Sequence, residues 1–148
     1  MKTHNSSITH VTGSSEFIDD RHSFRNEVFC DVYYSSKAHA KIVELDYSKV
    51  LALPKVVTVL TAKDLEHNAW GAIFQDQPIL ADKIVNFAGE PIAIIVAETL
   101  LAAQQAKKYF QIKYEELESI LSIDKAINQK SFIGDIRVIE NGDIKNSF

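Results

Sequence analysis

Short runs of β-branched and aromatic residues, separated by glycine, proline and polar residues, predict β-strands along the middle of the chain. The predicted strands are residues 28–34, 41–46, 56–60, 79–80, 83–87, 92–97 and 112–115. Residues 92–97 are apolar without interruption, which is typical of a central strand covered on both faces. Residues 66–78 lack any periodicity and are predicted to form a loop.

A helical spacing of apolar residues is clearest between Leu100 and Phe110. Thr99 precedes this helix as its expected N-cap, and the glutamines and lysines of the helix are expected to face outward. Shorter helices are predicted at 49–53, 62–65 and 123–127, with Ser48, Thr61 and Ser122 as their N-caps. Strands and helices alternate with short connections, which leaves an α+β fold and a parallel α/β sheet equally open.

A tight turn is predicted immediately before the apolar strand 92–97. Gly89 is followed two residues later by Pro91, a spacing that is strong turn punctuation. Gly89 is expected to adopt a backbone conformation, with little room for a Cβ, that favours glycine. Gly89 and Pro91 are therefore assigned a structural role in this turn.

Composition places the chain among ordinary globular proteins. Its 148 residues suit one domain, and 46% hydrophobic with 24% charged residues argue against disorder and low complexity. The net charge of −4 lacks the basic surplus that nucleic-acid binding needs. Cys30 is the single cysteine, so no internal disulfide forms, which fits a reducing cytoplasm. Residues 1–10 are too polar for a secretory signal, and the apolar run 92–101 is too short for a membrane span; we therefore expect a cytoplasmic protein.

The residues that could carry chemistry do not form a recognisable catalytic or metal-binding motif. The five histidines are scattered, at His4, His10, His22, His39 and His67. Ser35 and Ser36 lie near His39, but nothing indicates an oxyanion hole. The adjacent carboxylates are the pairs Asp19–Asp20 and Glu115–Glu116, and on a strand such neighbours point to opposite faces. The glycines do not cluster into a phosphate-binding loop. We therefore assign no catalytic, cofactor-binding or metal-ligating residue.

Trp70 and Phe74 in the loop 66–78 leave two interpretations open. They could form an exposed binding platform, or they could anchor the loop by burial, and burial is the favoured interpretation.

Several stretches together resemble the molybdenum-binding subunit of xanthine dehydrogenase and aldehyde oxidase enzymes. They are VTGSSEFIDD at 11–20, SSKAHAKI at 35–42, LPKVVTVLTAKDL at 53–65, PILA at 78–81, GEPIAIIVAET at 89–99, KYEEL at 113–117 and NGDI at 141–144. They follow the family order over nearly the whole chain. The chain is thereby identified as similar to the N-terminal α/β hammerhead domain of that subunit, closer to bacterial xanthine dehydrogenases than to carbon monoxide or isoquinoline enzymes. Three family prolines are replaced, by Ser36, Glu116 and Glu118.

The resemblance implies an α+β fold with a mixed sheet, one long helix and several short helices. It divides the chain into a flexible arm at 1–10, the hammerhead domain at 11–127, and a linker at 128–148 leading toward a molybdenum-cofactor-binding domain. In the family, the residues that hold the molybdenum pterin and the catalytic glutamate lie in later domains. The resemblance thus implies a noncatalytic scaffold that borders the substrate channel and is inactive alone.

By the same resemblance, the parent enzyme hydroxylates a purine or an aldehyde at molybdenum and passes electrons through 2Fe-2S clusters to FAD. The partners of this chain would be the molybdenum-cofactor domains and the iron–sulfur and flavin parts, with no nucleic acid and no membrane. An apolar face left uncovered would allow weak self-association. Two alternatives are a free-standing binding module without the enzyme, and a small hydrolase that uses His39 and a serine.

Overall fold

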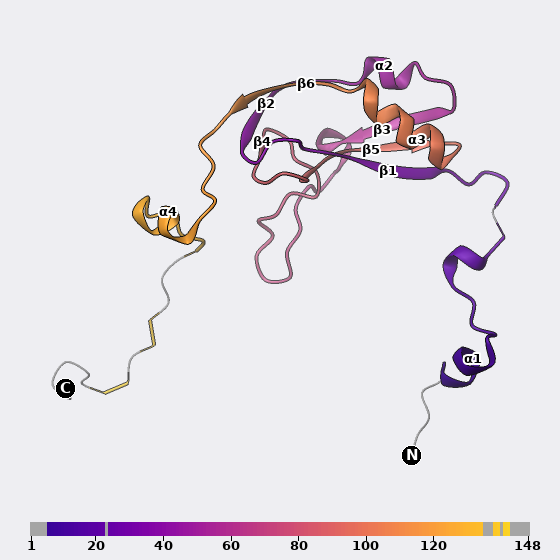
Figure 1. The fold of residues 1–148 in the computed structure, drawn as a ribbon, viewed down its shortest axis with the longest axis horizontal. Coiled ribbons are helices and arrows are strands. Elements are labelled where there is room, and N and C mark those ends of the chain that lie inside the picture. Colours follow the sequence, from indigo (N-terminus) through magenta and orange to yellow (C-terminus); the bar gives the residue numbers. More distant parts are fainter. Residues whose placement is uncertain (1–5, 23, 135–137, 140, 143–148) are drawn as a thin grey trace.

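The computed structural model describes residues 6–22, 24–134, 138–139 and 141–142. Figure 1 shows a central body with an arm at each end, both arms lying on the same side of the body. The helices are α1 (Ser7–Thr12), α2 (Ser48–Leu51), α3 (Leu100–Ala106) and α4 (Ile123–Asn128). The 3-10 turns are η1 (Ile18–Asp20), η2 (Ala62–Asp64) and η3 (Lys107–Tyr109). The strands are β1 (Phe29–Tyr34), β2 (Ala40–Asp46), β3 (Val56–Thr61), β4 (Ile84–Val85), β5 (Pro91–Ala97) and β6 (Gln111–Glu116).

The first sheet is antiparallel and has the order β1-β5-β3, with β5 in the centre. Helix α3 packs against β5 and β1, and Thr99 caps it by accepting a hydrogen bond from the Ala102 amide at 3.2 Å. Ala93, Ile95 and Ala97 of β5 are fully buried against this helix. The larger core cluster contains Val50, Val59, Ala93, Ile95, Ala97, Ala103, Ala106 and Phe110. The small alanine side chains let the helix approach the sheet closely. Residues of this chain alone therefore bury this core.

The second sheet is also antiparallel, with the order β4-β2-β6. A second core cluster contains the buried residues Ala40, Ala81, Val85 and Ile92, and it reaches the first sheet through Ile92 of β5. Tyr33 contacts both core clusters and stacks on Phe110 with ring centroids 4.1 Å apart. Burial, and to a lesser extent the nearby Tyr114, raises the pKa of Tyr33, so its phenol stays protonated at neutral pH. Tyr33 of β1 thus links the two core clusters.

Most predicted elements are confirmed, including the burial of β5, where Ile94 and Val96 are half-buried and the other residues from Ile92 to Ala97 fully so. The prediction of a strand at 79–80 is wrong. Asn68 takes the place of a strand partner there, because its side chain donates to the Leu80 carbonyl at 2.7 Å and accepts from the Leu80 amide at 2.9 Å. The α+β fold is confirmed, but two antiparallel sheets stand in place of the expected mixed sheet.

One of the predicted caps differs in detail. Ser48 lies inside α2, and the Asp46 carboxylate accepts from the Ser48 amide at 2.8 Å. Thr61 is the N-cap of η2 and forms a capping box with Asp64, in which the Thr61 hydroxyl also donates to the Asp64 carboxylate at 2.9 Å, beside the Thr61 amide at 2.7 Å. Of the expected N-caps, Thr61, Thr99 and Ser122 act as predicted.

The long helix was expected to run through Phe110 with its lysines outward. It ends at Ala106 and tightens into η3. Lys107 turns back to the sheet, where its ammonium lies 2.7 Å from Asp31 and 5.8 Å from the ring centre of Tyr34. The ion pair with Asp31 on β1 therefore holds Lys107 against the sheet, in place of the outward position that was predicted.

The arms have little core of their own. Helix α1 has no buried residue and ends in a left-handed cap at Gly13, so the described chain is helical across the expected boundary at residue 10. Helix α4 is capped by Ser122 and also has no buried residue. Within the described residues, no helix combines the length and the apolar character that crossing a membrane requires.

Candidate interaction site

The sequence candidates for catalysis are not brought together. His39 bonds through Nδ1 to the Glu118 carbonyl at 2.7 Å. The Ser35 hydroxyl donates to the Lys37 carbonyl at 2.9 Å and accepts from the Lys37 amide at 3.0 Å. A nucleophile must bond to its base, so these side chains hold a turn and do not form a serine–histidine pair.

The adjacent carboxylates form ion pairs and hydrogen bonds at the surface. Glu115 forms an ion pair with Lys41 at 3.0 Å, and Glu116 forms one with Lys37. Asp20 accepts from the Phe17 amide at 2.9 Å and closes η1. Groups of three or more metal-ligating side chains are absent from the part of the chain that the structure describes, which includes four of the five histidines; His4 lies outside it.

The shifted pKa values also mark local structure. Hydrogen bonds from Thr61 lower the pKa of Asp64, and hydrogen bonds from Ser48 lower that of Asp46. Lys125 lowers the pKa of Glu118, and Glu44 raises that of Lys113. Each shift arises from a local cap or a surface ion pair, so these groups mark local structure and not an acid–base pair.

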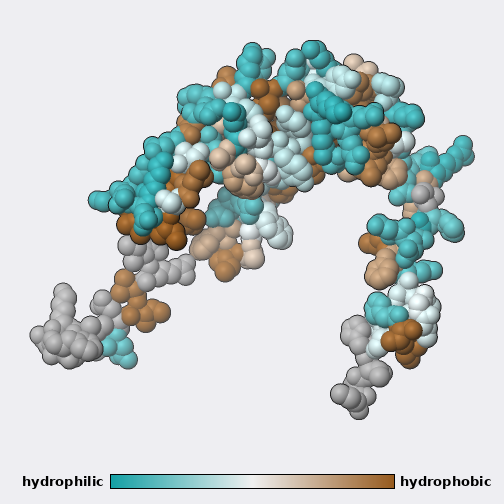
Figure 2. Space-filling model, in the orientation of Figure 1, coloured by the Kyte–Doolittle hydropathy of each residue, from teal (hydrophilic) through white to brown (hydrophobic). Residues whose placement is uncertain are grey.

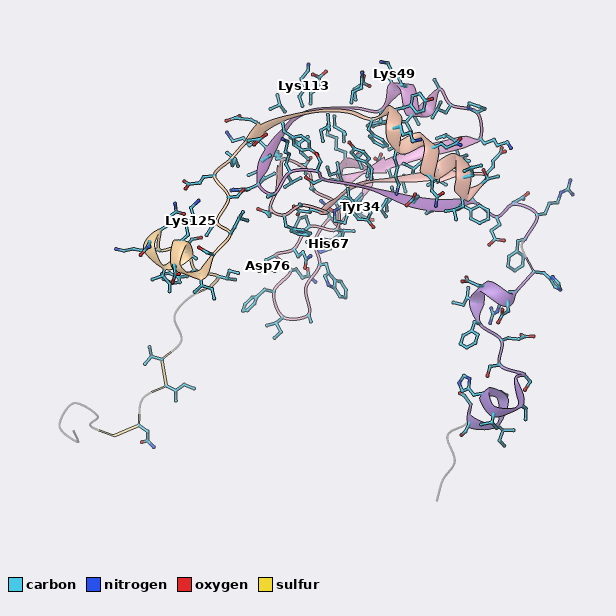
Figure 3. All side chains as sticks on the ribbon, in the orientation of Figure 1. Tyr34, Lys49, His67, Asp76, Lys113 and Lys125 are labelled. Carbon is cyan, nitrogen blue, oxygen red and sulfur yellow. The ribbon has the colours of Figure 1, made fainter. Side chains whose placement is uncertain are left out.

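The loop 66–78 is the clearest unusual feature. Trp70 is 66% exposed and Phe74 is 62% exposed, with Ile73 beside them at 86%. The favoured prediction of burial is therefore wrong, and both aromatic side chains are exposed. Figures 1 and 3 show the loop projecting away from both sheets, on the same side as the two arms. An exposed aromatic and aliphatic tip of this kind is typical of an interaction site.

The loop holds its shape through its own bonds. The backbones of Trp70 and Gln77 exchange two hydrogen bonds, at 2.7 and 3.1 Å. His67 and Gln75 bond through their side chains at 3.0 Å. A Cβ added at Gly71 would lie 1.6 Å from the Phe74 carbonyl oxygen, so only glycine fits there. The apolar tip is consequently presented on a defined scaffold.

A pocket of about 380 Å³ opens at the base of this loop. It is lined by Trp70, Gln77, Pro78, Ile79, Phe87, Glu90 and Pro91. Its volume falls in the range of small-ligand sites. Glu90 is its single charged residue and is only 3% exposed. We name this the Glu90 pocket.

The turn at 86–91 builds the floor of the Glu90 pocket. The Glu90 carboxylate accepts from the Asn86 amide, while Ser35 bonds through its backbone to Gly89 and Glu90 at 2.8 Å each. Gly89 has φ +91, a conformation that favours glycine, although a Cβ there would meet no atom within 4 Å; the expected steric exclusion is absent. Pro91 is the first residue of β5 and lines the pocket. Sequence reasoning missed the burial of Glu90, because a charged residue in a glycine–proline turn is ordinarily exposed.

The chain is similar to known proteins over most of its length. Residues 12–118 match the family model of the aldehyde oxidase and xanthine dehydrogenase a/b hammerhead domain. The chain belongs to this family. The xanthine dehydrogenase of Emericella nidulans is 36% identical over 98% of the chain, and aldehyde oxidase 1 of Oryctolagus cuniculus is 38% identical over 98%. The chain spans only 11% of the length of each of these relatives.

Solved structures agree with this assignment of a hammerhead domain. The CO dehydrogenase from Oligotropha carboxidovorans is 32% identical, with a TM-score of 0.74 over 84% of this chain and 16% of that one. The aldehyde oxidoreductase from Desulfovibrio desulfuricans is 25% identical, with a TM-score of 0.78 over 87% and 16%. The hammerhead domain thus belongs to the molybdenum hydroxylases, whose members act on chemically different substrates.

Proposed function

We propose that this chain is the noncatalytic hammerhead domain of a molybdenum hydroxylase that oxidises a purine or an aldehyde. Its task is to scaffold the molybdenum-cofactor-binding part and to border the path of the substrate. The parent enzyme carries molybdenum pterin with 2Fe-2S clusters and FAD, and it works in the cytoplasm. The domain ends near residue 127, and 128–148 link it to the cofactor-binding part. Asp143 and Ile144 of the linker motif lie outside the described residues.

The distribution of apolar surface carries this proposal. The two cores are closed by the chain itself, yet the loop 66–78 and both arms leave large side chains in solvent. On the two arms, which are residues 7–20 and 117–128, these side chains are Ile8, Val11, Phe17, Ile18, Ile120, Leu121, Ile123 and Ile127. Figure 2 shows this apolar colour on the loop and on both arms. Side chains of this kind are ordinarily covered by a partner.

The Glu90 pocket does not fit a molybdenum pterin. The cofactor is anionic, and the Glu90 pocket presents a carboxylate that would repel it. We therefore assign the cofactor to the other part of the enzyme and derive no chemical step within this chain.

A free-standing binding module is the rival proposal, and one experiment separates the two. The 148-residue chain is purified alone and after co-expression with the cofactor-binding polypeptide of the same organism. Molybdenum content, xanthine and aldehyde oxidation, and sedimentation are then measured on both samples.

We expect the chain alone to hold no stoichiometric molybdenum, to show no turnover, and to self-associate weakly. The co-expressed sample should form a one-to-one assembly that oxidises substrate. Stoichiometric molybdenum in the isolated chain would contradict the scaffold role. Failure of the two polypeptides to associate would favour the free-standing module.

A further inference from the structure

The Glu90 pocket combines aromatic walls with the buried carboxyl group of Glu90, which forms no ion pair with any residue that the structure describes. Glu90 is 97% removed from solvent, its exposed fraction being 3%. Its carboxylate accepts one hydrogen bond, from the Asn86 amide. None of the ion pairs among the described residues includes Glu90. A cation that reaches a buried carboxyl group of this kind stabilises its ionised form.

The walls of the pocket suit one kind of cation. Trp70 and Phe87 line it and are 66% and 46% exposed, so their rings can be reached from solvent. Pro78, Ile79 and Pro91 also line the pocket and add apolar surface to it. A planar guanidinium stacks on aromatic rings and is more weakly hydrated than an ammonium, so it loses less on entering such a site. It can also bond to the remaining lone pairs of the carboxylate.

We propose that the Glu90 pocket receives an arginine side chain from the cofactor-binding part of the enzyme. The pocket would then fix the hammerhead domain on that part through one buried, aromatic-flanked ion pair. The identity of the partner rests on the proposed function, whereas the preference for guanidinium rests on the pocket alone. Charge complementarity and the apolar loop beside the pocket together define where this contact forms.

The pocket is tested first on the chain alone with N-acetyl-arginine amide as the probe. N-acetyl-citrulline amide, which has the same shape without the charge, is the matched control ligand. Trp70 is the single tryptophan, so its indole N–H gives one unambiguous NMR signal at the pocket wall. We expect the arginine probe to shift this signal in a saturable way, with affinity in the millimolar range and with the citrulline probe at least about tenfold weaker, as loss of a charge-assisted hydrogen bond implies.

Two variants separate the role of charge from the role of structure. Glu90→Gln keeps an acceptor for the Asn86 amide but removes the charge, and we expect arginine binding to weaken about tenfold. Glu98→Gln makes the same change of net charge at an exposed position outside the loop and the pocket, and should leave binding unchanged. Absence of saturable binding, equal binding of citrulline, or an unaffected Glu90→Gln variant would each overturn the proposal.

The occupant is tested in the co-expressed assembly with the same probe. If an arginine of the partner fills the pocket, the probe no longer shifts the Trp70 signal, and Glu90→Gln weakens the assembly more than Glu98→Gln does. A pocket that still binds the probe in the assembly would overturn the proposed occupant. Failure of the chains to assemble, with probe binding intact, would count against the proposed function and leave the guanidinium preference of the pocket standing.

Discussion

Apolar side chains are buried in the central body, whereas those of the loop 66–78 are exposed. In the body, Ile95 and Ala103 are fully buried between β5 and α3. In the loop, Ile73 and Phe74 remain 86% and 62% exposed although their backbone is held by hydrogen bonds on either side. Burial of apolar side chains in the body therefore stabilises the folded chain. The loop instead leaves apolar surface accessible to a partner.

The largest expected effect contrasts one residue from each region. Ile95→Ala should lower the free energy of unfolding by about 3 kcal/mol, because it opens a cavity at a fully buried site. Ile73→Ala should change it by less than about 0.5 kcal/mol, because that side chain is in solvent. Urea denaturation of both variants checks the contrast. A similar loss in the two variants would show that the loop belongs to the core.

Gly71→Ala should have the next largest effect, and it acts on the loop first. The added Cβ would collide with the Phe74 carbonyl, so the loop must rearrange at a cost of about 1–3 kcal/mol. The NMR signal of the Trp70 indole should move, while the amide signals of β5 stay in place. Gly89→Ala is the matched control, since it has positive φ but open space around its Cβ. An unchanged indole signal in Gly71→Ala would contradict the described loop.

The sequence predicted the body better than the loop for a physical reason. Strands such as β3 and β5 are specified by their own β-branched residues, and the helix α3 by its alanines and its Thr99 cap. The pairing of these strands depends on contacts distant in sequence, which is why a single mixed sheet was expected. The exposure of Trp70 depends on the hydrogen bonds that hold the loop outward, and no local pattern encodes them.

The candidate site was predicted only in part. The loop 66–78 and its aromatic residues were identified, as was the turn at Gly89 and Pro91. The burial of Glu90 depends on the backbone hydrogen bonds between this turn and Ser35, which lies 55 residues earlier in the sequence than Glu90. Caps such as Thr61 were located correctly, but the additional hydrogen bond that the Thr61 hydroxyl donates depends on Asp64 three residues later.

Acid should affect the body through Asp64. The pKa of Asp64 is lowered below 3.8 because its carboxylate accepts hydrogen bonds from Thr61. A lowered folded pKa stabilises the protein above the unfolded value, and that contribution disappears as the pH falls through the folded value. Asp64→Asn should therefore be less stable at pH 7, and the difference should shrink below pH 3.8. Urea midpoints measured from pH 7 to pH 2.5, with Asp124→Asn as the control, check this; a difference that grows in acid would contradict it.

The smallest expected effect concerns Lys55, between α2 and β3. Lys55 has φ 69, a left-handed conformation that costs a non-glycine residue about 1–2 kcal/mol. Glycine relieves this strain but loses about 0.5–1 kcal/mol through the freedom of the unfolded chain. Lys55→Gly should thus raise the free energy of unfolding by about 0.5 kcal/mol, while Lys49→Gly in α2 lowers it. A destabilising Lys55→Gly would show that the side chain makes a compensating contact.

The central claim is that the loop and arms are covered by the cofactor-binding part while the body is complete without it. Amide hydrogen exchange of this chain, alone and in the co-expressed assembly, tests it most directly. We predict that residues 66–79 and the arms at 7–20 and 117–128 exchange more slowly in the assembly, with β3 and β5 unchanged. Equal exchange of the loop and arms in both samples, or protection gained mainly by β3 and β5, would contradict the claim.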